Sequence, residues 1–190
     1  MSASERTLRS PATVGGFGDA AVVLAGLGLL MWRVVAPASI LTPATLALLY
    51  AVVLSMSLTG SPDITSRPVP AISAAVLGAA AVTATRFLAG PAFGSVNMAS
   101  AFPLGIAAAI AEEAFFRRFL YSRLERAGGM IAVAVSALLF AAIHIPMYGW
   151  GAFPIDLAAG LLLSWQRWAS GSWLAPASTH ILANILAVIR

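Results

Sequence analysis

Seven long apolar segments, separated by glycine, proline or short polar stretches, constrain the fold of this chain more than any other feature. Apolar residue types make up 60% of the 190 residues and charged types only 9%. A soluble domain is nearer to half apolar and a quarter charged. A membrane-spanning helix needs about 20 mainly apolar residues, and about 17 can suffice. We therefore expect an all-α fold, a polytopic transmembrane helix bundle of about seven spans, at residues 17–35, 39–58, 71–89, 101–120, 129–146, 153–169 and 172–189.

The first apolar segment has a second interpretation. It follows a polar start that contains Arg6 and Arg9, and it precedes Ala36-Pro37-Ala38, so it resembles a secretory signal peptide with a cleavage site. More apolar segments follow at once, which favours a retained first span. The chain would then be a multi-pass protein of the cell membrane.

The arginines predict an orientation. On alternate sides of the expected spans, eight arginines fall with the N-terminus and the 120–130 turn, and three fall opposite, namely Arg33, Arg86 and Arg190. The positive-inside rule therefore predicts a cytoplasmic N-terminus. The net charge of +4 is explained by such loops, so no nucleic-acid partner is expected. The absence of cysteine excludes disulfides and thiolate metal sites.

Few ionisable groups interrupt the apolar segments. The only histidines are His144 and His180, and a third segment carries the adjacent acids Glu112 and Glu113. Ionisable groups inside a membrane are costly and by default mark a functional site. Glu113 and Arg117 have the i, i+4 spacing of a helical ion pair, which leaves Glu112 pointing elsewhere. The plainer alternative is two carboxylates at the membrane edge.

A helical hairpin would bring Glu112 and His144 together. Glu112 lies sixteen residues before Gly128, and His144 lies sixteen residues after it. If the chain reverses there, both side chains lie about 24 Å from the turn. A carboxylate beside an imidazole can hold and deprotonate a water molecule. Phe140 lies one turn before His144, where it can shield or orient the ring. Taken alone, His144 is more simply explained as a histidine bonded to a neighbouring helix.

The last apolar segment carries His180 and Asn184 at an i, i+4 spacing, so the two side chains share one helix face. Both can donate hydrogen bonds, and two convergent donors can stabilise an oxyanion. The alternative is a hydrogen bond that holds helices together in the membrane.

The three motifs together resemble a known family. Glu112-Glu113-Ala114-Phe115-Phe116-Arg117 matches EExxxR, Phe140 to His144 matches FxxxH, and His180 to Asn184 matches HxxxN. In this order they are similar to the motifs of the CPBP family, the CAAX protease and bacteriocin-processing intramembrane endopeptidases. The resemblance implies a catalytic helix core over 101–190, within one structural unit, and a three-span region over 1–100 without an assigned motif.

The expected reaction is hydrolysis of a peptide bond in a membrane-associated protein or peptide precursor. Glu112 would act as general base, His144 would hold the attacking water, and His180 and Asn184 would bind the oxyanion, with Glu113 and Arg117 supporting them. A zinc-dependent version would use Glu112, His144 and His180 as ligands. No cofactor is favoured, because the chain has no HExxH sequence.

Two other classes of function use the same residues. In a non-catalytic immunity or scaffold protein they would stabilise helix packing. In a proton-coupled transporter they would relay protons, although the chain shows no internal repeat. The expected partners are the lipid bilayer and, for an endopeptidase, a membrane-associated substrate.

Overall fold

The computed structural model describes residues 16–59, 68–88 and 98–188, and the regular structure in these ranges is entirely helical. The predicted all-α bundle is confirmed. Seven main helices correspond to the seven predicted spans: α1 (Gly16–Val35), α2 (Pro43–Ser57), α3 (Pro68–Leu88), α4 (Met98–Glu113), α6 (Gly129–Tyr148), α7 (Phe153–Ser170) and α8 (Leu174–Val188). Four short elements complete the described chain: η1 (Ala114–Leu120), α5 (Tyr121–Leu124), η2 (Glu125–Ala127) and η3 (Trp150–Ala152).

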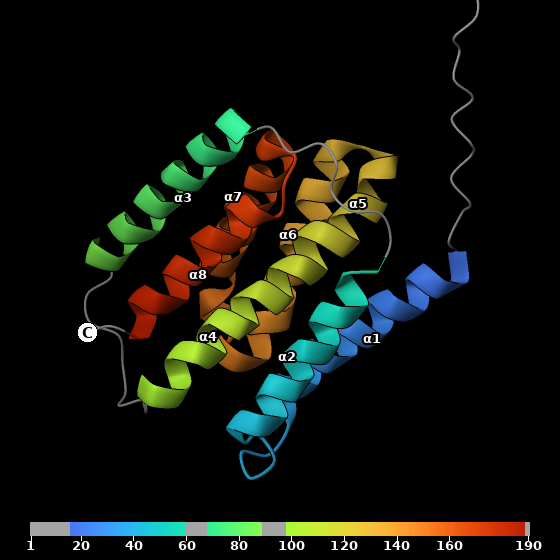
Figure 1. The fold of residues 1–190 in the computed structure, drawn as a ribbon, viewed down its shortest axis with the longest axis vertical. Helices are drawn as coiled ribbons and strands as arrows, with labels where there is room; N and C mark the ends of the chain where they lie inside the picture. Colours follow the sequence, from blue (N-terminus) through green and yellow to red (C-terminus); the bar gives the residue numbers. More distant parts are fainter. Residues whose placement is uncertain (1–15, 60–67, 89–97, 189–190) are drawn as a thin grey trace, which may run out of the picture.

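Helix α4 occupies the middle of the bundle (Figure 1), where it packs against α2 on one side and α8 on the other. Helices α6 and α7 form a closely packed antiparallel pair behind it. Helix α3 covers α7 and α8, and α1 lies against α2 and α6 at the opposite side. Segments from both halves of the chain therefore surround α4.

Length and composition fit a membrane bundle. Within the described part of the chain, Gly18–Val35 and Gly129–Tyr148 are long and apolar enough to cross a membrane, and three further apolar helices are shorter. Large apolar side chains such as Leu24, Leu48 and Ile72 are exposed on the outer helices. Side chains of this kind would be costly in water but not in lipid.

The helix ends follow local sequence signals with one exception. Thr42 caps α2 through a hydrogen bond from the Thr45 backbone N–H, and Pro43 takes the first helical position. We expected the fifth span to end at Pro146, but α6 continues to Tyr148 and stops at Gly149, whose φ is 79°. A proline this close to a helix end removes only one backbone hydrogen bond, so the glycine sets the boundary.

A seven-residue π-helix, η1, follows α4 without a break. All seven of its side chains are buried, and Phe115, Phe116 and Phe119 supply much of the aromatic core. The Phe115 and Phe116 rings meet edge to face with centroids 5.0 Å apart. This packed segment fixes the position of Glu112 and Glu113, which lie directly before it.

Two glycines allow close approach between helices. A Cβ atom on Gly160 of α7 would lie 2.9 Å from the Ala137 carbonyl oxygen of α6. A Cβ atom on Gly78 of α3 would collide with Gln166 of α7 and Thr179 of α8. Only glycine permits these close contacts of α7 with α6 and of α3 with α7 and α8.

Several arginines lie inside the bundle rather than in loops. Arg33, Arg117, Arg118 and Arg167 are all buried, with at most 9% of the residue surface exposed. Arg118, for example, donates to the Ser57 carbonyl oxygen. The positive-inside rule concerns arginines in loops, so these four buried residues carry no information about the orientation. The N-terminus, with Arg6 and Arg9, lies outside the described residues, and the predicted orientation stays a prediction.

Candidate active site

Glu112 is a buried carboxylate near the end of α4, with 2% of its surface exposed. Its Oε1 atom accepts a hydrogen bond from the Arg33 guanidinium of α1. Its Oε2 atom has no hydrogen-bond partner among the described residues. The structure therefore holds one oxygen of this carboxylate and leaves the other free for chemistry.

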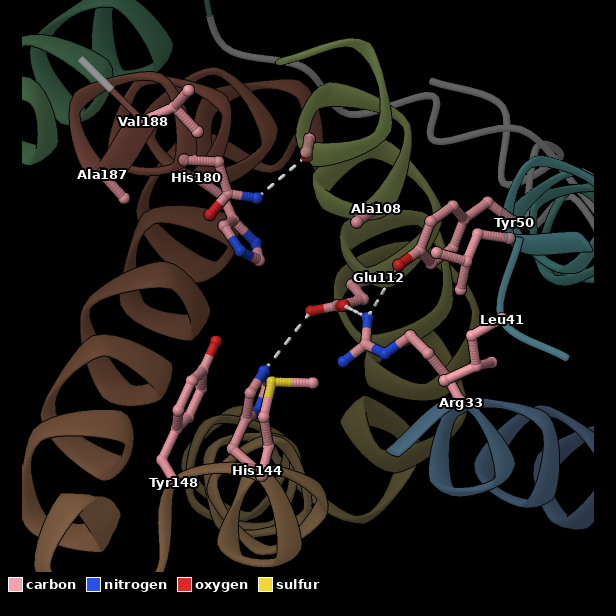
Figure 2. A pocket seen from close by; sticks show the side chains of 14 residues that line it. Arg33, Leu41, Tyr50, Ala108, Glu112, His144, Tyr148, His180, Ala187 and Val188 are labelled. Carbon is pink, nitrogen blue, oxygen red and sulfur yellow. Dashed lines mark hydrogen bonds and ion pairs between the residues drawn. The ribbon is translucent and has the colours of Figure 1, made fainter. Parts of the chain in front are cut away.

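His144 of α6 faces this free oxygen, as Figure 2 shows. Its Nε2 atom lies 3.8 Å from Glu112 Oε2, too far for a direct hydrogen bond. At this separation, one water molecule can lie within hydrogen-bond distance of both atoms. The expected hairpin thus brings Glu112 and His144 to the same place.

Backbone and ring contacts fix the orientation of His144. Its Nδ1 atom lies 2.7 Å from the Phe140 carbonyl oxygen. A carbonyl only accepts, so Nδ1 carries the proton and Nε2 of the neutral ring is an acceptor. The Phe140 ring centroid is 4.6 Å from that of His144, and the Tyr148 ring stacks on the other side at 5.9 Å. Phe140 therefore orients this histidine through its backbone as well as its ring.

Glu113 anchors two other side chains. Its Oε1 atom accepts from Arg117 at 3.0 Å, as the i, i+4 spacing predicts, and from His180 Nδ1 at 2.9 Å. Arg117 also donates to the Gly160 carbonyl oxygen and lies over the Phe140 ring, with its guanidinium carbon 4.5 Å from the centroid. The bond between Glu113 and His180 was not expected from the sequence.

That bond restricts what His180 can donate. A carboxylate accepts, so the Nδ1 proton of His180 is committed to Glu113. A neutral His180 would present Nε2 only as an acceptor. The ring can donate to an oxyanion, as we expected, only when Nε2 is protonated as well, and the negative Glu113 then faces the resulting cation.

Asn184 of α8 connects to α4. Its Nδ2 atom donates to the Gly105 carbonyl oxygen at 2.9 Å. A primary amide has two N–H groups, so one remains after this bond. The Gly105 position lies 3.6 Å from the Asn184 side chain when a Cβ atom is built on it, which places the amide tightly against α4.

All four residues expected to carry the chemistry line one cavity of about 390 Å³. This volume lies in the usual range for small-ligand sites. A smaller cavity, of about 170 Å³, shares His144, Tyr148, His180 and Asn184 with it. The lining of the larger cavity is part polar and part apolar: Arg33, Leu41, Leu46, Tyr50, Gly105, Ala108, Glu112, His144, Met147, Tyr148, His180, Asn184, Ala187 and Val188.

Sequence reasoning missed the contribution of the first two helices. Arg33 binds Glu112 across 79 positions of sequence, and Tyr50 accepts from Arg33 at 3.4 Å. We had placed Arg33 near the end of the span 17–35 and counted it with the arginines on the outer side. Ionisable groups are costly inside a membrane, which is why the histidines were singled out. The same reasoning applies to Arg33, which lies between Trp32 and Val34 in an apolar segment.

The zinc alternative would use Glu112, His144 and His180 as ligands. Within the described ranges, no three His, Cys, Asp or Glu side chains are grouped so that they could hold a metal ion. The Arg33 cation occupies one oxygen of Glu112, and Glu113 holds His180. Arg33 disfavours a second cation at Glu112, whereas the Nε2 atoms of His144 and His180 stay available as ligands because their Nδ1 atoms are the ones held by acceptors.

Comparison with known families identifies the C-terminal half. Residues 94–186 match the family model named Rce1-like, whose description is type II CAAX prenyl endopeptidase Rce1-like. This match includes all three motifs and confirms the resemblance to the CPBP family. No curated protein and no solved structure gave a match. The match supports a CAAX-type intramembrane protease.

Proposed function

We propose that this chain is a glutamic-type intramembrane endopeptidase of the CPBP family, because residues 94–186 match the Rce1-like family model. Its substrate is a membrane-associated protein or peptide precursor. One observation carries the proposal: Glu112 Oε2, which has no hydrogen-bond partner among the described residues, faces His144 Nε2 at 3.8 Å beside a cavity. This pair offers a base and a second acceptor to a single water.

Glu112 takes a proton from that water as the water oxygen attacks the substrate carbonyl carbon. His144 Nε2 accepts a hydrogen bond from the other O–H group of the water. This bond directs a lone pair of the water oxygen toward the carbon. The carbonyl oxygen becomes an oxyanion. When the C–N bond breaks, the leaving amine takes the proton from Glu112, which restores the carboxylate.

The oxyanion is stabilised by donors on α8. Asn184 offers the amide N–H that Gly105 does not use. His180 adds a second donor in its cationic form, with Glu113 as the counter-charge. One such donor typically contributes about 10²–10³-fold to the rate.

The proposed reaction uses no metal. Metal analysis of purified, active protein tests this part separately. A stoichiometric zinc ion that is required for cleavage would replace the glutamic mechanism by the metal-dependent one.

The test of the function is Glu112→Gln, which keeps the size of the side chain but removes the base. Membranes of cells that carry wild-type or variant protein are compared for C-terminally and N-terminally truncated peptides. We expect cleavage products to be lost in Glu112→Gln, a fall of at least about 10²-fold. Arg33 borders the cavity, so water can solvate it in this variant and the fold should persist.

Glu125→Gln is the matched control. Glu125 is an exposed acid of η2, thirteen positions later, and contacts none of the site residues. This variant should process substrate at the wild-type rate. If Glu112→Gln also does so while remaining folded, the chain is not an endopeptidase of this kind, and a non-catalytic membrane protein would explain the same contacts.

A further inference from the structure

Arg33 is a buried cation on a helix with few buried residues. Only 7% of its surface is exposed, although no more than 17% of the residues in Gly18–Val35 are buried. A buried charge is costly unless it is paired, and replacing such a pair by apolar side chains is often neutral or stabilising. Arg33 is therefore not explained by stability alone.

Arg33 contacts Glu112 and Tyr50, which both line the cavity. Its Nη1 atom donates to Glu112 Oε1 and to the Tyr50 hydroxyl, and its guanidinium lies over the Tyr50 ring at 5.8 Å. Figure 2 shows Glu112 between Arg33 on one side and His144 on the other. Arg33 is thus held by α2 while it holds the carboxylate of α4.

The hydrogen bond from Arg33 matters because the Glu112 carboxylate could otherwise rotate about its terminal torsion. The terminal torsion of a glutamate is broad and roughly two-fold. Without Arg33, nothing among the described contacts would hold Oε1, and the carboxylate could turn onto His144 Nε2, only 3.8 Å away. A direct hydrogen bond requires a proton on Nε2, which the ring would take up from water in the cavity, and it would occupy both atoms that are needed to hold the attacking water.

We propose that Arg33 is a positioning residue for Glu112: it restrains Oε1 so that Oε2 and His144 stay apart and share a water. The proposal rests on the proposed function. It extends the working site to α1 and α2, which lie outside the matched residues 94–186.

The kinetic test uses a fluorogenic peptide built on a cleavage site mapped by the membrane comparison above. Arg33→Gln should lower kcat by about 10²-fold, the cost typical of a small misplacement of reacting groups, with KM within about three-fold of wild type. Arg33→Lys should restore part of kcat, because it returns the charge without the planar fork. Tyr50→Phe should lower kcat by several-fold, because Arg33 loses one of its supports.

Arg123→Gln is the control for a merely structural role. Arg123 of α5 also forms an ion pair with α1, to Asp19 at 3.1 Å, and it does not line the cavity. This variant should keep the wild-type kcat. Equal losses in Arg33→Gln and Arg123→Gln would mean that attachment of α1 is what matters, and would overturn the proposal.

A second measurement needs no substrate and applies to any variant that folds. The chain has two histidines, so ¹⁵N-histidine labelling gives the signals of two rings. In Arg33→Gln the Nε2 signal of His144 should move from that of an acceptor toward that of a protonated nitrogen bonded to Glu112. The His180 signals should stay in place. Unchanged His144 signals would overturn the proposal.

The outcomes separate the two proposals. If Glu112→Gln loses cleavage while Arg33→Gln keeps the wild-type kcat, the positioning role of Arg33 is wrong and the proposed endopeptidase activity stands. A loss that appears only in KM would make Arg33 a substrate-binding residue and equally overturn positioning. An active Glu112→Gln removes the basis of both.

Discussion

At the scale of single residues, two adjacent carboxylates have different surroundings. Glu113 is fully buried against Arg117, which is itself fully buried. Glu112 borders a cavity and keeps one oxygen without a partner. Removing one member of a dry ion pair leaves an uncompensated charge, whereas a charge beside a cavity can be hydrated. The two acids should therefore respond differently to the same substitution.

Glu113→Gln should reduce the free energy of unfolding by about 3–5 kcal/mol, since it leaves the cation of Arg117 unpaired in the protein interior. Glu112→Gln should cost less. Thermal unfolding in detergent, measured side by side with the wild type, gives both values. An equal loss of stability in the two variants would contradict this account of their surroundings.

Asn184→Ala should lower the rate of cleavage by about 10²–10³-fold while leaving most of the protein folded, because it removes an oxyanion donor. Ser178→Ala provides a control on the same helix, since Ser178 bonds only locally, to the Ala175 carbonyl oxygen. Initial rates on the mapped peptide test both. A wild-type rate for Asn184→Ala would remove this residue from the mechanism.

The sequence was sufficient to single out Glu112, His144, His180 and Asn184, which line the cavity, because polar residues are costly in an apolar segment. It also predicted the pair of Glu113 and Arg117, which depends on one helical turn. It did not predict the bonds of Arg33 to Glu112 or of His180 to Glu113. These bonds depend on which helices become neighbours, and no local spacing encodes that.

At the scale of elements, helix boundaries followed the apolar segments and their glycines, but the π-helix η1 was not predicted. An apolar pattern of seven residues does not distinguish π from α geometry, because side-chain packing in the bundle decides between them. The wider turn lies directly after Glu112 and Glu113. Segments of this kind are frequent at functional sites.

Close contact of α6 with α7 is a further property of elements that can be tested. Gly160→Ala should destabilise the protein by about 1–3 kcal/mol, because its Cβ atom would press on the Ala137 backbone. The shift would also move the residue's own carbonyl oxygen, which accepts from Arg117. Gly28→Ala on α1 is the control, since a Cβ atom there meets nothing within 4 Å. Thermal unfolding should show a loss for the first variant only.

At the scale of the whole molecule, the region before the matched domain contributes directly to the cavity. Leu41, Leu46 and Tyr50 line it together with Arg33. We had expected a three-span region without an assigned motif. The order in which helices pack around α4 could not be predicted from the sequence, because each apolar helix could face several neighbours equally well.

The lack of cysteine makes the predicted orientation directly testable. Glu125→Cys and Gly151→Cys place single thiols before and after α6, a helix about 30 Å long. With an impermeant maleimide on intact cells, Gly151→Cys should react and Glu125→Cys should react only after lysis. The reverse pattern would invert the orientation that the arginines predict.

The bond between Arg33 and Glu112 has a consequence for inheritance. A descendant that lost only the acid would keep a cation at the edge of the cavity, where water can hydrate it, and one that lost only the arginine would keep a carboxylate there. Either loss alone should therefore remove the chemistry before it prevents folding. Lineages that abandon the reaction should be able to change one position at a time, and a chain that retains a single member of the pair would mark such a departure.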